Sequence, residues 1–187
     1  MKSSVGIVFL VAHLLVVAID SNTEATISGG DLLLPACKTV GGGSTFFDVE
    51  FCVSALGSDD DRSRDAAGYR DFAAVAVDLL TANATGTAAR INGLINSAGG
   101  EDEAMTRCLE SCRALYEDVL DRQRGCAAAV KDGRFGEAAA SLEKSAAAAE
   151  ECEGGFGKSK VASPVKVEGD SAFKLAKLAV ALLRFAS

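Results

Sequence analysis

Six cysteines are the side chains in this sequence whose chemistry is most readily assigned. In a secreted protein such residues usually form disulfides, whereas in the cytosol they stay reduced or bind metals. Six cysteines allow 15 complete pairings, and spacing alone does not select among them. The positions are Cys37, Cys52, Cys108, Cys112, Cys126 and Cys152.

Histidine is nearly absent, and this excludes most hydrolytic mechanisms. The single histidine, His13, lies in the N-terminal apolar segment. Without it the chain has no imidazole to activate a serine or cysteine nucleophile and none to bind zinc. The three aspartates at 59–61 stand beside Arg62 and Arg64, and we expect a solvated loop there. The sequence therefore predicts a binding protein rather than an enzyme, with no catalytic residues, no metal site and no cofactor.

The first 25 residues have the pattern of a secretory signal peptide. Lys2 precedes an apolar run from Val5 to Ile19, and small residues follow near Ala25. A run of this length is shorter than the roughly 20 residues needed to span a bilayer. We expect cleavage near Ala25, secretion, and no membrane contact after the signal is removed.

The remaining residues, 26–187, are expected to form one acidic domain. Removal of the signal peptide leaves a net charge of −6, compared with −7 for the whole chain. A chain of this charge is a poor partner for nucleic acid, so we expect no nucleic-acid binding.

The cysteines are carried by elements that read as helices. Between Arg107 and Asp121 apolar residues recur at three- and four-residue steps, so one stripe with Cys112 faces a core. An alanine-rich helix over 135–152 brings Cys152 to its end, where an antiparallel Cys112 could lie opposite. A bridge between them would contribute roughly 4 kcal/mol in the chain-entropy model.

Two more long helices complete the pattern, giving an all-α fold. One is expected over 66–98, with its apolar stripe at Phe72, Val75, Leu79, Ala82, Ala89 and Leu94. The other is expected over 171–184, with Phe173, Leu175, Leu178, Leu182 and Phe185 directed inward. With the helix that ends near Lys131 and the alanine-rich helix over 135–152, they predict an up-down-up-down four-helix bundle over 66–185. A helical hairpin over 31–56 precedes it, with Phe46 among its apolar residues.

Several segments in this order resemble the plant invertase and pectin methylesterase inhibitor family. Cys112 opens a Cys-x-x-Leu-Tyr-x-Asp motif, and Cys152 lies in Glu-Cys-Glu-x-x-Phe. The resemblance extends over about residues 31–185 and includes LLLPACKTV, AVAVDLLTANAT and the final ASPVKVEGDSAFKLAKLAVALL. It implies a four-helix bundle with an N-terminal helical hairpin, and a protein inhibitor of a secreted carbohydrate-active enzyme.

The resemblance also implies which cysteines pair. The family pattern joins Cys37 to Cys52 and Cys112 to Cys152, which leaves Cys108 and Cys126 as buried thiols. Cys108 lies one turn before Cys112 and is the alternative partner of Cys152. On one helix Cys108 and Cys126 would lie ~27 Å apart, too far for a bond.

A turn between the two disulfide-linked helices is the candidate target-binding site. Invertase inhibitors of the family insert a Pro-Lys-Phe turn, preceded by Asp, into the enzyme's cleft. The corresponding residues are Gly133, Arg134 and Phe135, after Asp132. Arg134 keeps the cation and Phe135 the ring, while Gly133 replaces the proline and is expected to form a left-handed cap. The alternative is a plain helix–helix turn, with Phe135 as the first core residue.

The target that we favour is a cell-wall or vacuolar invertase (β-fructofuranosidase), which would be blocked at its active site in the apoplast or the vacuole. A pectin methylesterase is the alternative, although the segment before Cys152 lacks the Trp and Thr usual in that branch. A secreted helical carrier of small apolar ligands is a remote alternative, because facing alanines would close its cavity. Finally, Asn83-Ala-Thr85 is a glycosylation sequon just off the apolar stripe.

Overall fold

The computed structural model describes residues 29–97 and 102–186, so the predicted signal peptide lies outside the described residues. Within these ranges the chain forms seven α-helices and no strand, which confirms the all-α fold class. The helices are α1 (Gly29–Gly41), α2 (Val49–Gly57), α3 (Asp60–Arg64), α4 (Tyr69–Ser97), α5 (Glu103–Lys131), α6 (Phe135–Ser159) and α7 (Lys166–Leu183).

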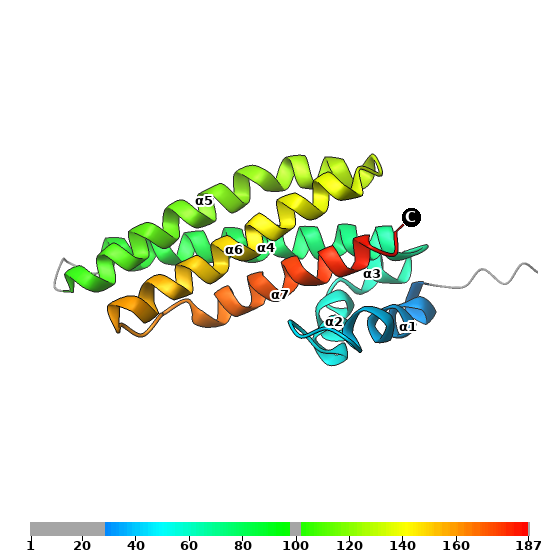
Figure 1. Cartoon of the computed structure of the whole chain (residues 1–187), viewed down its shortest axis with the longest axis horizontal. Helices are drawn as coiled ribbons and strands as arrows, with labels where there is room; N and C mark the ends of the chain where they lie inside the picture. Colours follow the sequence, from blue (N-terminus) through cyan, green and yellow to red (C-terminus); the bar gives the residue numbers. More distant parts are fainter. Residues whose placement is uncertain (1–28, 98–101, 187) are drawn as a thin grey trace, which may run out of the picture.

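Helices α4 to α7 form a bundle in which successive helices run in opposite directions (Figure 1). Each packs on two neighbours: α5 and α7 on α4, and α5 and α7 on α6. The α1–α2 hairpin and α3 pack against one end of this bundle, beside α7 and the start of α4. The α5–α6 turn and the end of α7 also lie at this end of the bundle (Figure 1).

Local signals fix where several helices begin and end. The Asp102 carboxylate accepts a hydrogen bond from the Met105 amide at 3.0 Å, which caps the start of α5. Asp48 caps α2 in the same way through the Phe51 amide at 2.7 Å. At the end of α6, Lys160 adopts φ 55° and the Val161 amide donates to the Phe156 carbonyl at 3.0 Å. The helix thus ends in a left-handed cap without glycine.

Helix α4 corrects the expected pattern of burial. Phe72 and Val75 are buried as expected, but Ala82 and Ala89 are exposed, and Leu80, Ala84 and Ile91 are buried instead. Helix α4 contacts α2, α3, α5 and α7, so the face it buries is set by several neighbours. Alanine is too weakly hydrophobic to indicate that face from sequence. By length and composition α4 could also span a membrane. Half of its apolar stretch is buried inside the protein, however, as in the core of a helix bundle.

Residues 59–64 correct a second expectation, since the predicted loop is largely the short helix α3. The buried Ser63 hydroxyl donates to the Leu56 carbonyl at 2.7 Å, which ties α3 to the end of α2. Arg62 forms an ion pair with Asp78 of α4, with Nη2 and Oδ2 2.7 Å apart. The carboxylates of this stretch therefore pair with Arg62 and Arg64 nearby, and Arg62 links α3 to the bundle.

Helices α6 and α7 are both longer than expected. Helix α6 continues past Cys152 to Ser159, through Gly154, Gly155 and Gly157. Phe156 is fully buried in this extension, and its packing outweighs the low helix propensity of the glycines. Helix α7 begins at Lys166, soon after Pro164, rather than at Ser171.

Two disulfides are present, in the pairs that the family resemblance implies. Cys37–Cys52 joins α1 to α2 with Cα atoms 5.5 Å apart, and Cys112–Cys152 joins α5 to α6 with Cα atoms 4.8 Å apart. Cys108 and Cys126 are free and buried. Burial raises the pKa of the Cys126 thiol to about 11, so this group stays protonated at neutral pH.

We predict that Cys112→Ala destabilises the protein more than Cys126→Ala does. The first change opens a bridge across 40 residues and leaves Cys152 unpaired, whereas the second removes one small buried group. The expected losses in unfolding free energy are ~2–5 and ~1 kcal/mol. Denaturant unfolding of both variants beside the parent measures the difference, and equal midpoints would contradict it.

Candidate functional site

The turn between α5 and α6 has a backbone that is fixed by its own hydrogen bonds. The Gly133 amide donates to the Val130 carbonyl at 3.2 Å, and the Arg134 amide donates to the Ala129 carbonyl at 2.8 Å. Gly133 has φ +74°, as predicted for a left-handed cap. These features make a Schellman motif, in which glycine at the left-handed position lets the chain reverse at once. Helix α6 begins only two residues later, so Arg134 stands at the tip of a short and well-defined turn.

The Arg134 side chain is exposed and is held between two carboxylates. Its relative exposure is 46%, and Nη2 lies 3.0 Å from Asp132 Oδ2, while Nη1 contacts Glu137 Oε2. Hydrogen bonds to Glu137 and then to Asp132 raise the pKa of the guanidinium above its ordinary value. Solvent-exposed ion pairs are weak, because water competes for both charges. The guanidinium can therefore exchange these partners for a better-placed carboxylate on another protein.

Phe135 has one side in the core and one side at the surface. It is half-buried, packs against the hydrophobic core, and is the first residue of α6. Its ring also lines a shallow hollow with Ala139 of α6 and with Val180 and Leu183 of α7. Phe135 is thus a core residue, as expected for a plain helix–helix turn. It also has an exposed edge beside Arg134.

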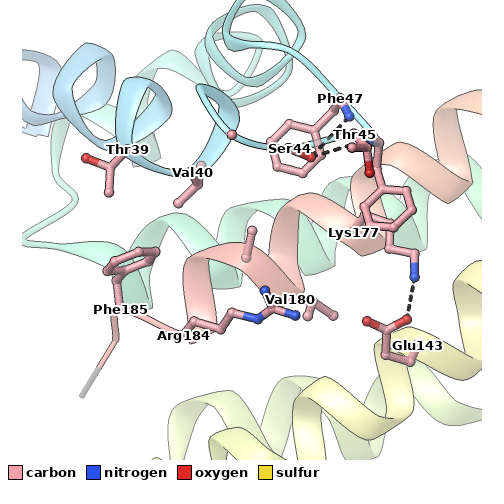
Figure 2. A pocket seen from close by; sticks show the side chains of 13 residues that line it. Thr39, Val40, Ser44, Thr45, Phe47, Glu143, Lys177, Val180, Arg184 and Phe185 are labelled. Carbon is pink, nitrogen blue, oxygen red and sulfur yellow. Dashed lines mark hydrogen bonds and ion pairs between the residues drawn. The ribbon is translucent and has the colours of Figure 1, made fainter.

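A second hollow lies between α7 and the loop that joins α1 to α2, which we call the hairpin loop. The sequence did not indicate this hollow. Figure 2 shows Lys177 of α7 and Arg184, which follows α7, in this hollow, with Glu143 of α6 on one side and the hairpin loop on the other. Its volume is about 310 Å³. Lys177 Nζ lies 2.5 Å from Glu143 Oε2 and 4.6 Å from the centre of the Phe46 ring.

Two aromatic residues at this hollow are exposed, and for Phe185 this corrects the expectation that it is directed inward. Phe46 is 47% exposed and meets Phe173 edge-on at 5.8 Å between ring centres. Phe185 is 48% exposed and lies against the Tyr69 ring, with the two ring centres 5.3 Å apart. The sequence signal that could have indicated this hollow was the spacing of Lys174, Lys177 and Arg184. These positions place three cations along one face of α7 and its end.

The predicted glycosylation site is half-buried beside the hairpin. Asn83 lines a hollow between α4, α2 and α7, together with Phe51, Ser58 and Leu175. Its backbone carbonyl accepts a hydrogen bond from the Thr87 hydroxyl at 2.8 Å. Modification of Asn83 stays a prediction. Among residues 29–97 and 102–186, no three His, Cys, Asp or Glu side chains are grouped to hold a metal ion.

Comparison with known proteins places this arrangement among plant inhibitors. Residues 35–182 match the family model described as plant invertase/pectin methylesterase inhibitor. Two similar solved structures are a mutant form of a pectin methylesterase inhibitor from Arabidopsis and a pectin methylesterase inhibitor from Arabidopsis thaliana. The first has a TM-score of 0.64 and 18% identity, covering 73% of this chain and 88% of the other. The second has a TM-score of 0.60 and 15% identity, covering 83% and 96%. At these identities the likeness shows the fold alone, and a search of curated proteins gave no significant match.

We predict that Gly133→Ala destabilises the protein, whereas Gly136→Ala does not. A Cβ at Gly133 meets no atom within 4 Å, so the cost is that of the left-handed backbone, about 1–2 kcal/mol. Gly136 is helical and equally open, and alanine there should stabilise α6 by roughly 0.5 kcal/mol. Urea unfolding of the pair measures both effects. An unchanged midpoint for Gly133→Ala would refute the left-handed cap.

Proposed function

Because the chain belongs to the plant invertase/pectin methylesterase inhibitor family, we propose that it is a secreted protein inhibitor that docks on an invertase and blocks its active site. The proposal rests on the α5–α6 turn. This turn combines a fixed backbone, an exposed guanidinium and an adjoining aromatic ring at one end of the bundle.

The chemistry of a glycosidase cleft suits this turn. Such clefts are built around a pair of carboxylates. A guanidinium inserted between them can bond one carboxylate through two parallel hydrogen bonds, away from water. Arg134 would leave Asp132 and Glu137 to do so, and the exposed edge of Phe135 would pack at the mouth of the cleft.

A pectin methylesterase is the second candidate target, and the pairing of Arg134 favours it. Asp132 and Glu137 neutralise the guanidinium within the turn, and part of the Phe135 ring is used in the core. An inhibitor that docks through helix faces would not need a free cation at this position. Parallel assays against the two enzymes separate the candidates.

Secretion is part of the proposal and is supported by two features. An apolar N-terminal segment has the composition of a signal peptide, and two disulfides join helices of the domain. Disulfides persist in oxidising compartments. We place the protein in the apoplast, with the vacuole as the second location.

We predict that Arg134→Ala weakens inhibition of a cell-wall invertase by roughly thirtyfold to several-thousandfold, as for truncation of a buried interfacial charge. Inhibition constants of the purified mature protein measure this, with a pectin methylesterase assayed in parallel. Arg134→Glu should weaken inhibition further.

Arg107→Ala is the matched control for this test. Arg107 is also exposed and forms an ion pair within its helix, with Nη1 2.7 Å from Glu103 Oε1. It lies near the start of α5, at the end of the helix opposite to the α5–α6 turn. The Arg107→Ala variant should inhibit invertase as the parent does. The melting temperatures of both alanine variants should lie within about 2 °C of that of the parent. If Arg134→Ala also inhibits invertase like the parent, the turn does not enter the cleft.

A further inference from the structure

The hollow beside Phe135 and the hollow beneath the hairpin loop are adjacent and share three lining residues. Both are lined by Glu143 of α6, Val180 of α7 and Arg184, the residue that follows α7. Together they make one groove along α7, which we call the α7 groove. It runs from Phe135 at the α5–α6 turn to Phe46 on the hairpin loop, and its two parts have volumes of about 390 and 310 Å³.

The free charge in the α7 groove is positive, although the chain as a whole carries −7. Lys177 and Glu143 neutralise each other within the groove. Arg184, at the junction of the two parts, is exposed, and no ion pair or hydrogen bond of its guanidinium is present among the described residues. Charge complementarity therefore favours a partner that brings a carboxylate to this junction.

Two aromatic rings of the groove, those of Phe46 and Phe185, are exposed and held in place by neighbouring rings. Phe46 packs against Phe173, and Phe185 packs against Tyr69. Both Phe46 and Phe185 line the part beneath the hairpin, where Figure 2 shows Phe185. Because these contacts already restrict the rings, little side-chain entropy is lost when a partner covers them. Aromatic and arginine side chains are also those that most often anchor interfaces.

A stable interface requires more surface area than the α5–α6 turn provides. Stable protein–protein complexes bury about 800 Å² on each partner, contributed by some 20–30 residues. A turn of three residues supplies only a small part of this. The surface that adjoins Phe135 is the α7 groove, so docking of the turn brings this groove against the target.

We propose that the α7 groove is a second anchoring surface for the target enzyme, and that it receives an acidic loop of that enzyme from the rim of its active-site cleft. A carboxylate of the loop pairs with Arg184, and an apolar side chain of the loop lies between Phe46 and Phe185. This inference rests on the proposed function, because the docked turn sets the position of the groove on the enzyme.

Charge reversal at the junction tests the inference, with the enzyme that the parent protein inhibits as the probe. Arg184→Glu should raise the inhibition constant at least tenfold and slow association, and added salt should affect this variant less than the parent. Arg184→Lys should retain most of the inhibition. Phe46→Ala should weaken it while the α5–α6 turn is unchanged.

Arg124→Glu is the control, since Arg124 is an exposed arginine of α5 with no ion pair among the described residues. It should leave the inhibition constant within about twofold of the parent, as for a surface charge outside the interface. If Arg184→Glu inhibits as Arg124→Glu does, the groove is not an anchoring surface, and the proposed function stands. If the parent inhibits neither an invertase nor a pectin methylesterase, the proposed function and the groove both fail.

Discussion

The joining of α5 and α6 at two separate points is the constraint on which the rest of the structure depends. The Gly133 cap turns the chain back at one end, and the Cys112–Cys152 disulfide holds the helices together farther along. Cys112 precedes the end of α5 by 19 residues, or ~29 Å of helix. Two fixed points this far apart leave the helix pair little freedom to slide or to splay, so α4 and α7 pack on a rigid surface.

Small side chains let these helices approach closely. Ala138, Ala146 and Ala149 are buried along α6, which packs against both α5 and α7. Gln123 and Ser145 are also buried, and the Gln123 amide donates to the Ser145 hydroxyl at 3.3 Å between α5 and α6. The bundle thus combines an alanine face, which sets a short helix separation, with a polar contact that favours one register.

The hairpin is attached to the bundle by a different kind of contact. The Cys37–Cys52 disulfide stabilises the hairpin itself, and lysines of α7 reach the aromatic rings that it presents. Lys174 lies 5.5 Å from the centre of the Phe51 ring, and Lys177 lies over Phe46 while paired with Glu143. Cation–π contacts are strongest where water is partly excluded, and the Lys177 side chain is only 16% exposed. The same contacts leave Phe46 exposed, which connects the seating of the hairpin to the surface proposed for docking.

The sequence alone was sufficient for the features that depend on local chemistry. It predicted the four long helices, the cap at Gly133 and, through the family resemblance, both cysteine pairs. Periodicity and a glycine can each be read within a short stretch, and the order of motifs can be read along the chain. It did not show that α6 continues to Ser159, that Ala84 is buried while Ala82 is exposed, or that Phe46 and Phe185 face the surface. These depend on which helices meet and at what angle. The α7 groove is of this second kind, since Phe46, Glu143 and Arg184 become neighbours only when three distant segments pack together.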